Sequence, residues 1–123
     1  MTCSKQFFDA YMGCALWASS DESNDQGGVP LDANYTPDDL DDSALRSMRA
    51  DCDTFYESNR ADIDNVKDDS ACGHDFWLTR NHHGAGFWDR GLGEIGERLT
   101  KAAHAYGESY LYLDTYHGYI FVS

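Results

Sequence analysis

Residues able to do acid–base or metal chemistry gather in one short stretch of the sequence. Residues 74–90 hold His74, Asp75, Arg80, His82, His83, Asp89 and Arg90. Imidazole exchanges protons near neutral pH, and a carboxylate can orient it or bind a metal ion beside it. Two histidines and an aspartate can ligate Zn²⁺, Mn²⁺ or Ni²⁺. A small metal-binding protein or hydrolase using residues 74–89 is therefore one candidate function.

The spacing of these residues matches no motif that carries a known mechanism. There is no His-Glu-x-x-His pair and no phosphate-binding glycine loop, and no nucleotide, flavin or haem motif is present. Adjacent His82 and His83 would be exposed in a turn, or would face opposite sides of a strand. The sequence therefore favours a protein that is not an enzyme and holds no metal or cofactor.

The second source of chemistry is negative charge. The chain has 22 Asp and Glu against 9 Lys and Arg, for a net charge of −13, and residues 21–75 carry nearly all of that excess. Like charge repels nucleic acid and anionic membranes, so the composition argues against both as direct partners and favours a basic protein surface. A solvated acidic face and adaptation to high salt are the alternatives. Residues 76–123 are nearly balanced, which weakens the high-salt interpretation.

The elements that would position these residues follow from hydrophobic spacing. Residues 4–18 predict a buried helix capped by Ser4. Thr36 and Pro37, followed by two aspartates, are typical of a helix start, and apolar residues then recur as far as Val66. We therefore expect an acidic loop over 19–35 and one long acidic helix over 37–66, bent near residues 58–59.

The second half of the chain predicts two hairpins around a helix. Aromatic residues in 73–80 and 85–90 flank an Asn/Gly loop, which indicates a β-hairpin. Residues 92–106 predict a helix, and 109–114 with 119–122 a second hairpin. The order helix-helix-hairpin-helix-hairpin indicates an α+β fold, a single domain over residues 1–123 with a small antiparallel sheet packed against helices.

Two surfaces are candidates for binding a partner. A helix over 37–66 would be about 45 Å long, enough for its carboxylates to cover several DNA phosphate positions. The acidic surface comprises Asp38, Asp39, Asp41, Asp42, Asp53, Glu57, Asp64 and Asp68. The second choice is the aromatic hairpin, where strand alternation exposes at least one tryptophan. Its residues are Trp77, Arg80, Trp88 and Arg90.

Four cysteines and the first twenty residues bear on the compartment. The cysteines are widely spaced and match no zinc pattern, so we expect reduced, mostly buried thiols. The first twenty residues lack a basic segment followed by an apolar one, and no apolar run is long enough to cross a bilayer. An intracellular protein is expected.

Residues 73–97 (GHDFWLTRNHHGAGFWDRGLGEIGE) and 31–40 (LDANYTPDDL), with the acidic segment that follows, resemble a family of small acidic proteins of tailed phages. His82 stands where that family commonly has glycine. The resemblance implies a phage gene product acting in the host cytoplasm, and it supplies no catalytic residues. Small acidic phage proteins often inhibit restriction enzymes or CRISPR effectors, some by imitating the charge of nucleic acid.

The resulting hypothesis is an inhibitor of a host defence nuclease or nucleic-acid-guided complex. It would place the acidic surface against a basic channel of that partner. A phage accessory protein without an inhibitory role is a further alternative, and the sequence leaves the oligomeric state undetermined.

Overall fold

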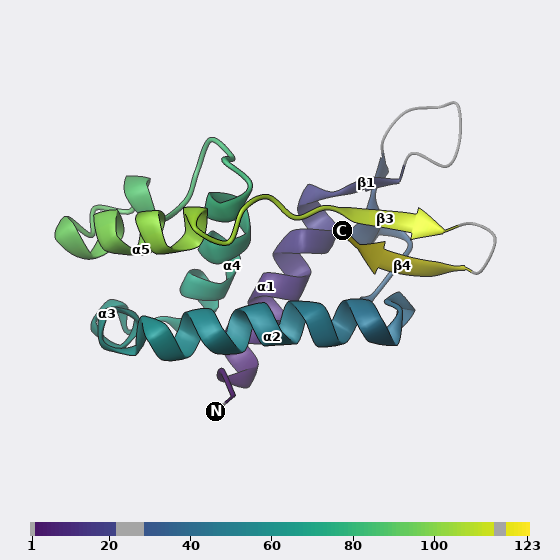
Figure 1. Ribbon diagram of the computed structural model, residues 1–123. Helices are drawn as coiled ribbons and strands as arrows, with labels where there is room; N and C mark the ends of the chain where they lie inside the picture. Colours follow the sequence, from purple (N-terminus) through teal and green to yellow (C-terminus); the bar gives the residue numbers. More distant parts are fainter. Residues whose placement is uncertain (1, 22–28, 115–117) are drawn as a thin grey trace.

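The computed structural model describes residues 2–21, 29–114 and 118–123 of the chain (Figure 1). Helices dominate, and the strands form two separate two-stranded antiparallel sheets. In chain order the elements are α1 (Lys5–Ala18), β1 (Ser20–Asp21), β2 (Val29–Pro30), the 3-10 turns η1 (Leu31–Ala33) and η2 (Pro37–Asp39), α2 (Asp42–Ser58), α3 (Arg60–Val66), α4 (Asp69–Arg80), the 3-10 turn η3 (Phe87–Asp89), α5 (Glu94–His104), β3 (Leu111–Asp114) and β4 (Tyr119–Val122). The expected α+β class is confirmed.

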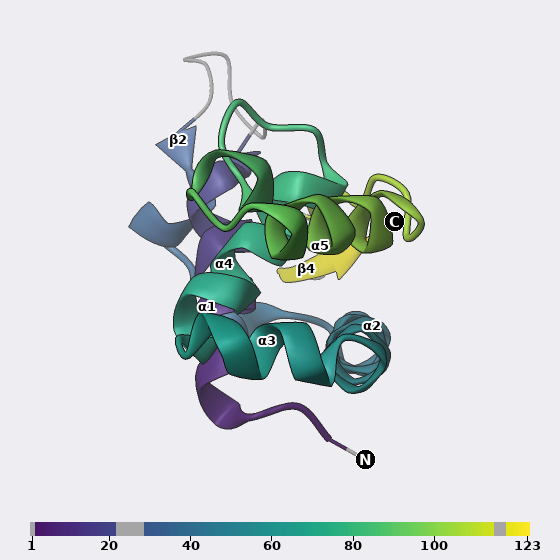
Figure 2. The ribbon, with the colours of Figure 1, turned by 90° about the vertical axis from the view of Figure 1, so that its left-hand side faces the viewer.

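The pair α1 and α4 forms the centre of the molecule, with α5 on one side and α2 on the other (Figures 1 and 2). Ser4 caps α1 as predicted, accepting a hydrogen bond from the backbone N–H of Phe7. Gly73 of α4 lies directly on the Phe7 carbonyl, where a Cβ would come within 2.0 Å of the oxygen. The close approach of these two helices therefore depends on a glycine.

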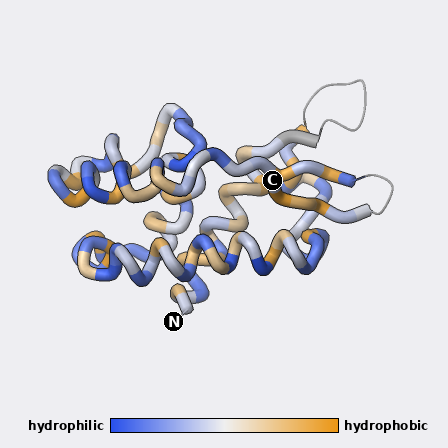
Figure 3. The backbone as a smooth tube through the Cα atoms, viewed as in Figure 1, coloured by the Kyte–Doolittle hydropathy of each residue, from blue (hydrophilic) through white to orange (hydrophobic). Residues whose placement is uncertain are grey.

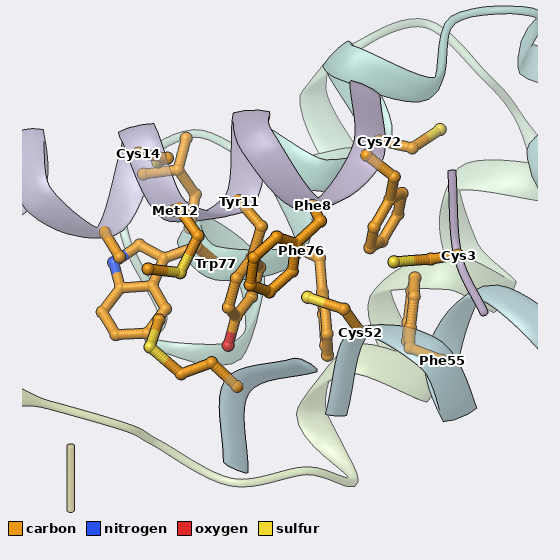
Figure 4. Packing of buried hydrophobic residues seen from close by; sticks show 14 of the residues in the cluster. Cys3, Phe8, Tyr11, Met12, Cys14, Cys52, Phe55, Cys72, Phe76 and Trp77 are labelled. Carbon is orange, nitrogen blue, oxygen red and sulfur yellow. The ribbon is translucent and has the colours of Figure 1, made fainter. Parts of the chain in front are cut away.

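Aromatic rings from four elements fill the core between the helices (Figure 4). The rings of Phe55 in α2 and Phe76 in α4 stack with centroids 4.0 Å apart, and Phe7 and Phe87 extend the cluster from α1 and η3. Such burial of large apolar surface is the main source of stability in a domain of this size.

The four cysteines belong to the same core. All four thiols are free and buried, as expected. Burial raises the pKa of Cys3 to about 11 and those of Cys14 and Cys72 to about 12, so these thiols stay protonated at neutral pH.

The predicted long helix is divided into shorter elements. Thr36 does form a capping box, but on the 3-10 turn η2, and the backbone of Leu40 then becomes extended. Helix α2 begins with a new cap, Asp41, and ends at Ser58, where the expected bend is a break. Helix α3 runs across the axis of α2, as Figure 2 shows with α2 nearly end-on. A single helix over 37–66 is therefore wrong.

The first predicted hairpin is also wrong, because residues 73–80 belong to helix α4. Asp68 caps this helix through the Ala71 N–H, at 3.0 Å. Eight of the twelve residues of α4 are buried, so it lacks the one-sided pattern of a surface helix. Residues 87–89 form the 3-10 turn η3 instead of a strand, and Gly96 of α5 packs on the Phe87 carbonyl.

The second predicted hairpin is confirmed as β3 and β4, which pair in antiparallel register from Leu111 opposite Val122 to Asp114 opposite Tyr119. The turn at 115–117 lies outside the described residues, as does 22–28 of the expected acidic loop; that loop is flanked by the short pair β1–β2. Helix α5 also agrees with prediction. Among the described residues, no helix is long and apolar enough to cross a membrane.

Candidate functional site

The candidate site is an acidic pocket where the C-terminal strand meets the start of α2. Its first wall is η2, where the Asp39 carboxylate accepts from the Thr36 N–H at 2.8 Å and the Asp38 N–H donates to the Thr36 hydroxyl at 3.3 Å. These bonds fix the turn and leave the Asp38 side chain exposed to solvent.

The second wall is the connection from η2 to α2. Leu40 pairs with Ile120 of β4 in a parallel bridge, and the Asp41 N–H donates to the Ile120 carbonyl at 2.8 Å. The Asp41 carboxylate caps α2 by accepting from the Ser43 N–H at 2.9 Å and from the Ser43 hydroxyl. Hydrogen bonding by Ser43 lowers the pKa of Asp41, so this carboxylate stays ionised well into the acid range.

Together these segments enclose a polar cavity of about 350 Å³. Its walls are Asp38, Leu40, Asp41, Asp42 and Tyr119. Among the described residues, no lysine or arginine lies within ion-pair distance of any aspartate in 38–42. Four carboxylates within five residues thus form no ion pair within the described part of the chain, and Arg46 acts on Asp41 only from beyond contact distance.

The other acidic residues of the predicted surface lie outside the pocket and have different local roles. Asp53 is half-buried and accepts from the Cys3 N–H at 2.8 Å, and Asp64 pairs with Arg60 at 3.1 Å. Asp68 caps α4, while Glu57 is exposed near the end of α2. The eight residues are therefore distributed over η2, α2, α3 and the cap of α4 instead of along one continuous helix.

The middle of α2 interrupts the negative surface. Arg46 and Arg49 lie on the same helical stripe as Asp42 and Asp53, since residues three and four apart share a face. Figure 3 shows hydrophilic and hydrophobic residues alternating along this helix. Acidic side chains concentrate at the pocket end, and the central stretch is balanced.

The four residues of the second candidate surface, the aromatic hairpin, do not lie on one surface. Trp77 is 2% exposed and Arg80 4%, so both belong to the core, contrary to expectation. Trp88 is 55% exposed, as expected for at least one tryptophan, but it lies in the 3-10 turn η3 and not in an alternating strand. Arg90 is partly exposed, but its guanidinium donates two hydrogen bonds to Asp75, at 2.9 and 3.0 Å.

Burial of Arg80 follows from partners that the local sequence does not reveal. Its guanidinium donates to the Tyr11 hydroxyl at 3.0 Å, to Asp51 at 2.8 Å, and to the carbonyls of Gly107 and Tyr106 at 2.9 and 3.2 Å. Because α4 is a helix, the side chain points into the junction of α1, α2 and the end of α5.

The histidines do not assemble into a site. His74 is half-buried beside Cys14 and Trp17, and His82 stacks on His104 with ring centroids 4.4 Å apart. His83 is exposed, and the two oxygens of Asp75 are taken by Arg90. Within the described part of the chain, no group of three or more His, Cys, Asp or Glu could hold a metal ion.

The sequence did not predict that the C-terminal hairpin lies next to the aspartates of 38–42. Tyr119 closes the pocket, and alternation places Tyr110, Tyr112 and Phe121 on the same outward face of the β3–β4 sheet. Tyr110, Tyr112 and Tyr119 are each about half exposed. In the sequence, the alternation of these tyrosines with the apolar residues Leu111 and Ile120 already indicated which face of the hairpin is exposed.

The fold and this site define a small acidic α+β domain with an acidic pocket beside an aromatic sheet face. Comparison with protein-family models, curated proteins and solved structures finds no match to this chain.

Proposed function

We propose that this is an acidic binding protein whose acidic pocket takes a basic segment of a nucleic-acid-binding partner. The observation that carries the proposal is that none of the four aspartates of 38–42 forms an ion pair within the described structure, so no positive charge contacts them directly. A lysine or arginine side chain from a partner would supply that charge, and the cavity of about 350 Å³ has room for it. The chain acts by binding and not by catalysis.

The surroundings of the pocket suit a protein partner. Tyr119 lines the pocket and is about half exposed, and aromatic rings attract cations. The outward tyrosines of β3–β4 add the kind of aromatic surface that is enriched in interfaces. The net charge of −13 would draw a basic partner from a distance and make association sensitive to salt.

The finer proposal concerns the identity of the partner. A basic channel that normally holds DNA or RNA presents many lysines and arginines, and an acidic protein seated in it would exclude the nucleic acid. With the resemblance to acidic phage proteins, this supports inhibition of a host defence nuclease or nucleic-acid-guided complex in the host cytoplasm.

Partner capture from bacterial lysate, followed by competition, tests the proposal. The variant D38N/D41N/D42N removes three charges from the pocket, and asparagine at 41 preserves the helix cap. The matched control D9N/E94Q/E97Q removes three exposed charges elsewhere.

We expect wild type and control to capture the same nucleic-acid-binding protein at about 50 mM salt, and to release it at about 300 mM or on adding double-stranded DNA. The pocket variant should lose it. Equal capture by both variants, or a captured protein that DNA does not displace, contradicts the proposal.

A further inference from the structure

A second surface of the molecule carries two arginines that form no ion pair among the described residues. An open groove of about 530 Å³ lies between α1 and α2. We call it the arginine groove; its walls are Phe8, Leu45, Arg46, Arg49, Ala50 and Asp53. Phe8, Leu45 and Ala50 supply an apolar floor, and the two arginines stand over it.

These arginines differ from every other arginine of the chain. Arg60, Arg80, Arg90 and Arg98 each form an ion pair with an aspartate. Arg46 and Arg49 have no carboxylate within 4.0 Å among the described residues, although the protein carries 22 acidic side chains.

Local sequence does not explain this. Asp42 lies four residues before Arg46 and Asp53 four residues after Arg49, the spacing at which helical ion pairs form. Arg49 instead lies over the ring of Phe8, with its Cζ 3.7 Å from the centroid, and donates weakly to the Cys3 sulfur at 3.8 Å. Asp53 is engaged by the Cys3 N–H.

Stacking on Phe8 leaves the guanidinium of Arg49 suited to a particular ligand. The guanidinium lies over the ring and Nη1 donates weakly to Cys3, whereas Nε and Nη2 have no hydrogen-bond partner among the described residues, so their edge of the plane remains available. A carboxylate can accept two parallel hydrogen bonds from such an edge, and Arg46 adds a second positive charge nearby.

We propose that the arginine groove binds a segment of a partner protein in which a carboxylate side chain stands next to an apolar one. The carboxylate would lie between Arg46 and Arg49, and its apolar neighbour on Leu45 and Ala50. Binding at this groove does not depend on the acidic pocket, because the two sets of lining residues have no member in common.

Charge and shape favour this ligand over other anions. Asp42 and Asp53 border the arginines, so the groove has little net positive charge and would repel the successive phosphates of a nucleic acid. A fatty acid carries one carboxylate, but small-molecule sites bury most of their ligand, whereas this groove is open to solvent along its length.

NMR titration of the ¹⁵N-labelled full chain tests the inference. The probe is the peptide acetyl-Leu-Asp-Leu-amide, compared with acetyl-Leu-Asn-Leu-amide, sodium octanoate and inorganic phosphate. We expect the aspartate peptide to shift amide signals around the groove and to bind most tightly of the four. Long-range repulsion by a net charge of −13 would favour the asparagine peptide, so the reverse preference reports a local site.

Variants then locate the charge. R46Q/R49Q should weaken binding of the aspartate peptide about tenfold, the sum of two partly exposed charge pairs. R46Q alone, which leaves the packing of Phe8 untouched, should weaken it about threefold. The control K67N/K101Q removes two exposed positive charges elsewhere, and it should change the affinity less than twofold.

Three results would overturn the inference. They are equal binding of the aspartate and asparagine peptides, unchanged affinity in R46Q, and tighter binding of octanoate or phosphate than of the aspartate peptide. Absence of any shift up to about 10 mM peptide, which corresponds to less than 3 kcal/mol, also overturns it.

Discussion

Replacing Arg80 by methionine should destabilise the protein severely. The guanidinium is 4% exposed and donates to four groups: Tyr11, Asp51 and the carbonyls of Tyr106 and Gly107. Methionine has similar length and fills the space, but it leaves the carbonyls and the hydroxyl without their donor. Losing four hydrogen bonds of about 1 kcal/mol each gives a loss of about 4 kcal/mol. The Asp51 side chain is 36% exposed and can regain water, so the ion pair adds little beyond its hydrogen bond.

The measurement is urea unfolding followed by circular dichroism at pH 7. For a slope of about 2 kcal/mol per molar, a loss of about 4 kcal/mol lowers the unfolding midpoint by roughly 2 M. Arg80→Lys retains the charge but not the planar fork, and we expect about half of that loss. It also provides a folded variant if Arg80→Met unfolds entirely.

Arg98→Met is the matched control. Arg98 also donates two hydrogen bonds to an aspartate, Asp62, but its side chain is 54% exposed. Exposed pairs contribute about 1 kcal/mol or less, so its midpoint should fall by at most roughly 0.5 M. Equal losses for Arg80→Met and Arg98→Met would refute the claim that burial sets the cost.

Two further predictions concern packing and pH. Gly73→Ala should lower the free energy of unfolding by about 3 kcal/mol, because the new Cβ would collide with the Phe7 carbonyl. Gly13→Ala, in an open helical position, should raise it by about 0.5–1 kcal/mol. Unfolding midpoints that move in the same direction in both variants would contradict this. The lowered pKa values of Asp41 and Asp62, caused first by hydrogen bonds from Ser43 and Arg98, mean that their contribution is complete above about pH 4 and disappears as pH falls through the lowered values. The urea concentration at the unfolding midpoint, measured from pH 7 to 2, should decrease once the pH is below 4. The decrease should be less steep for Asp41→Asn, and identical slopes would rule out the Asp41 contribution.

Elements with local signals could be predicted from the sequence. Helix α1 has helical apolar spacing and a capping serine, and the β3–β4 hairpin alternates apolar and polar residues around a turn. The break at Asn59 was also visible as a weak point. In each case the residues that specify the element lie inside it or next to it.

Helix α4 could not be predicted because its surroundings determine it. It is buried on nearly all sides, so its aromatic run resembles a strand, and Gly73 looks like a helix breaker until α1 is packed against it. Its start, the cap at Asp68, lies two residues beyond the predicted helix 37–66, and Asp68 was assigned to the acidic surface instead. Propensity here yields to tertiary packing.

For the same reason, the sequence predicted only the acidic part of the candidate site. The aspartates of 38–42 stand out in the sequence, but Tyr119 joins them only through the bridge between Leu40 and Ile120. Arg80 looked like a contact residue because its buried partners are at least 26 residues away. No local pattern reports such distances.

The bridge between Leu40 and Ile120 also orders the events of folding. Joining these residues closes a loop of 80 positions, which costs about 2.5 kcal/mol more chain entropy than closing the β3–β4 turn. The hairpin and the helices should therefore form first, and strand docking should be a late step. Since β4 is synthesised after every helix, a nascent chain would carry its cluster of aspartates for most of its translation without the wall that makes them a pocket.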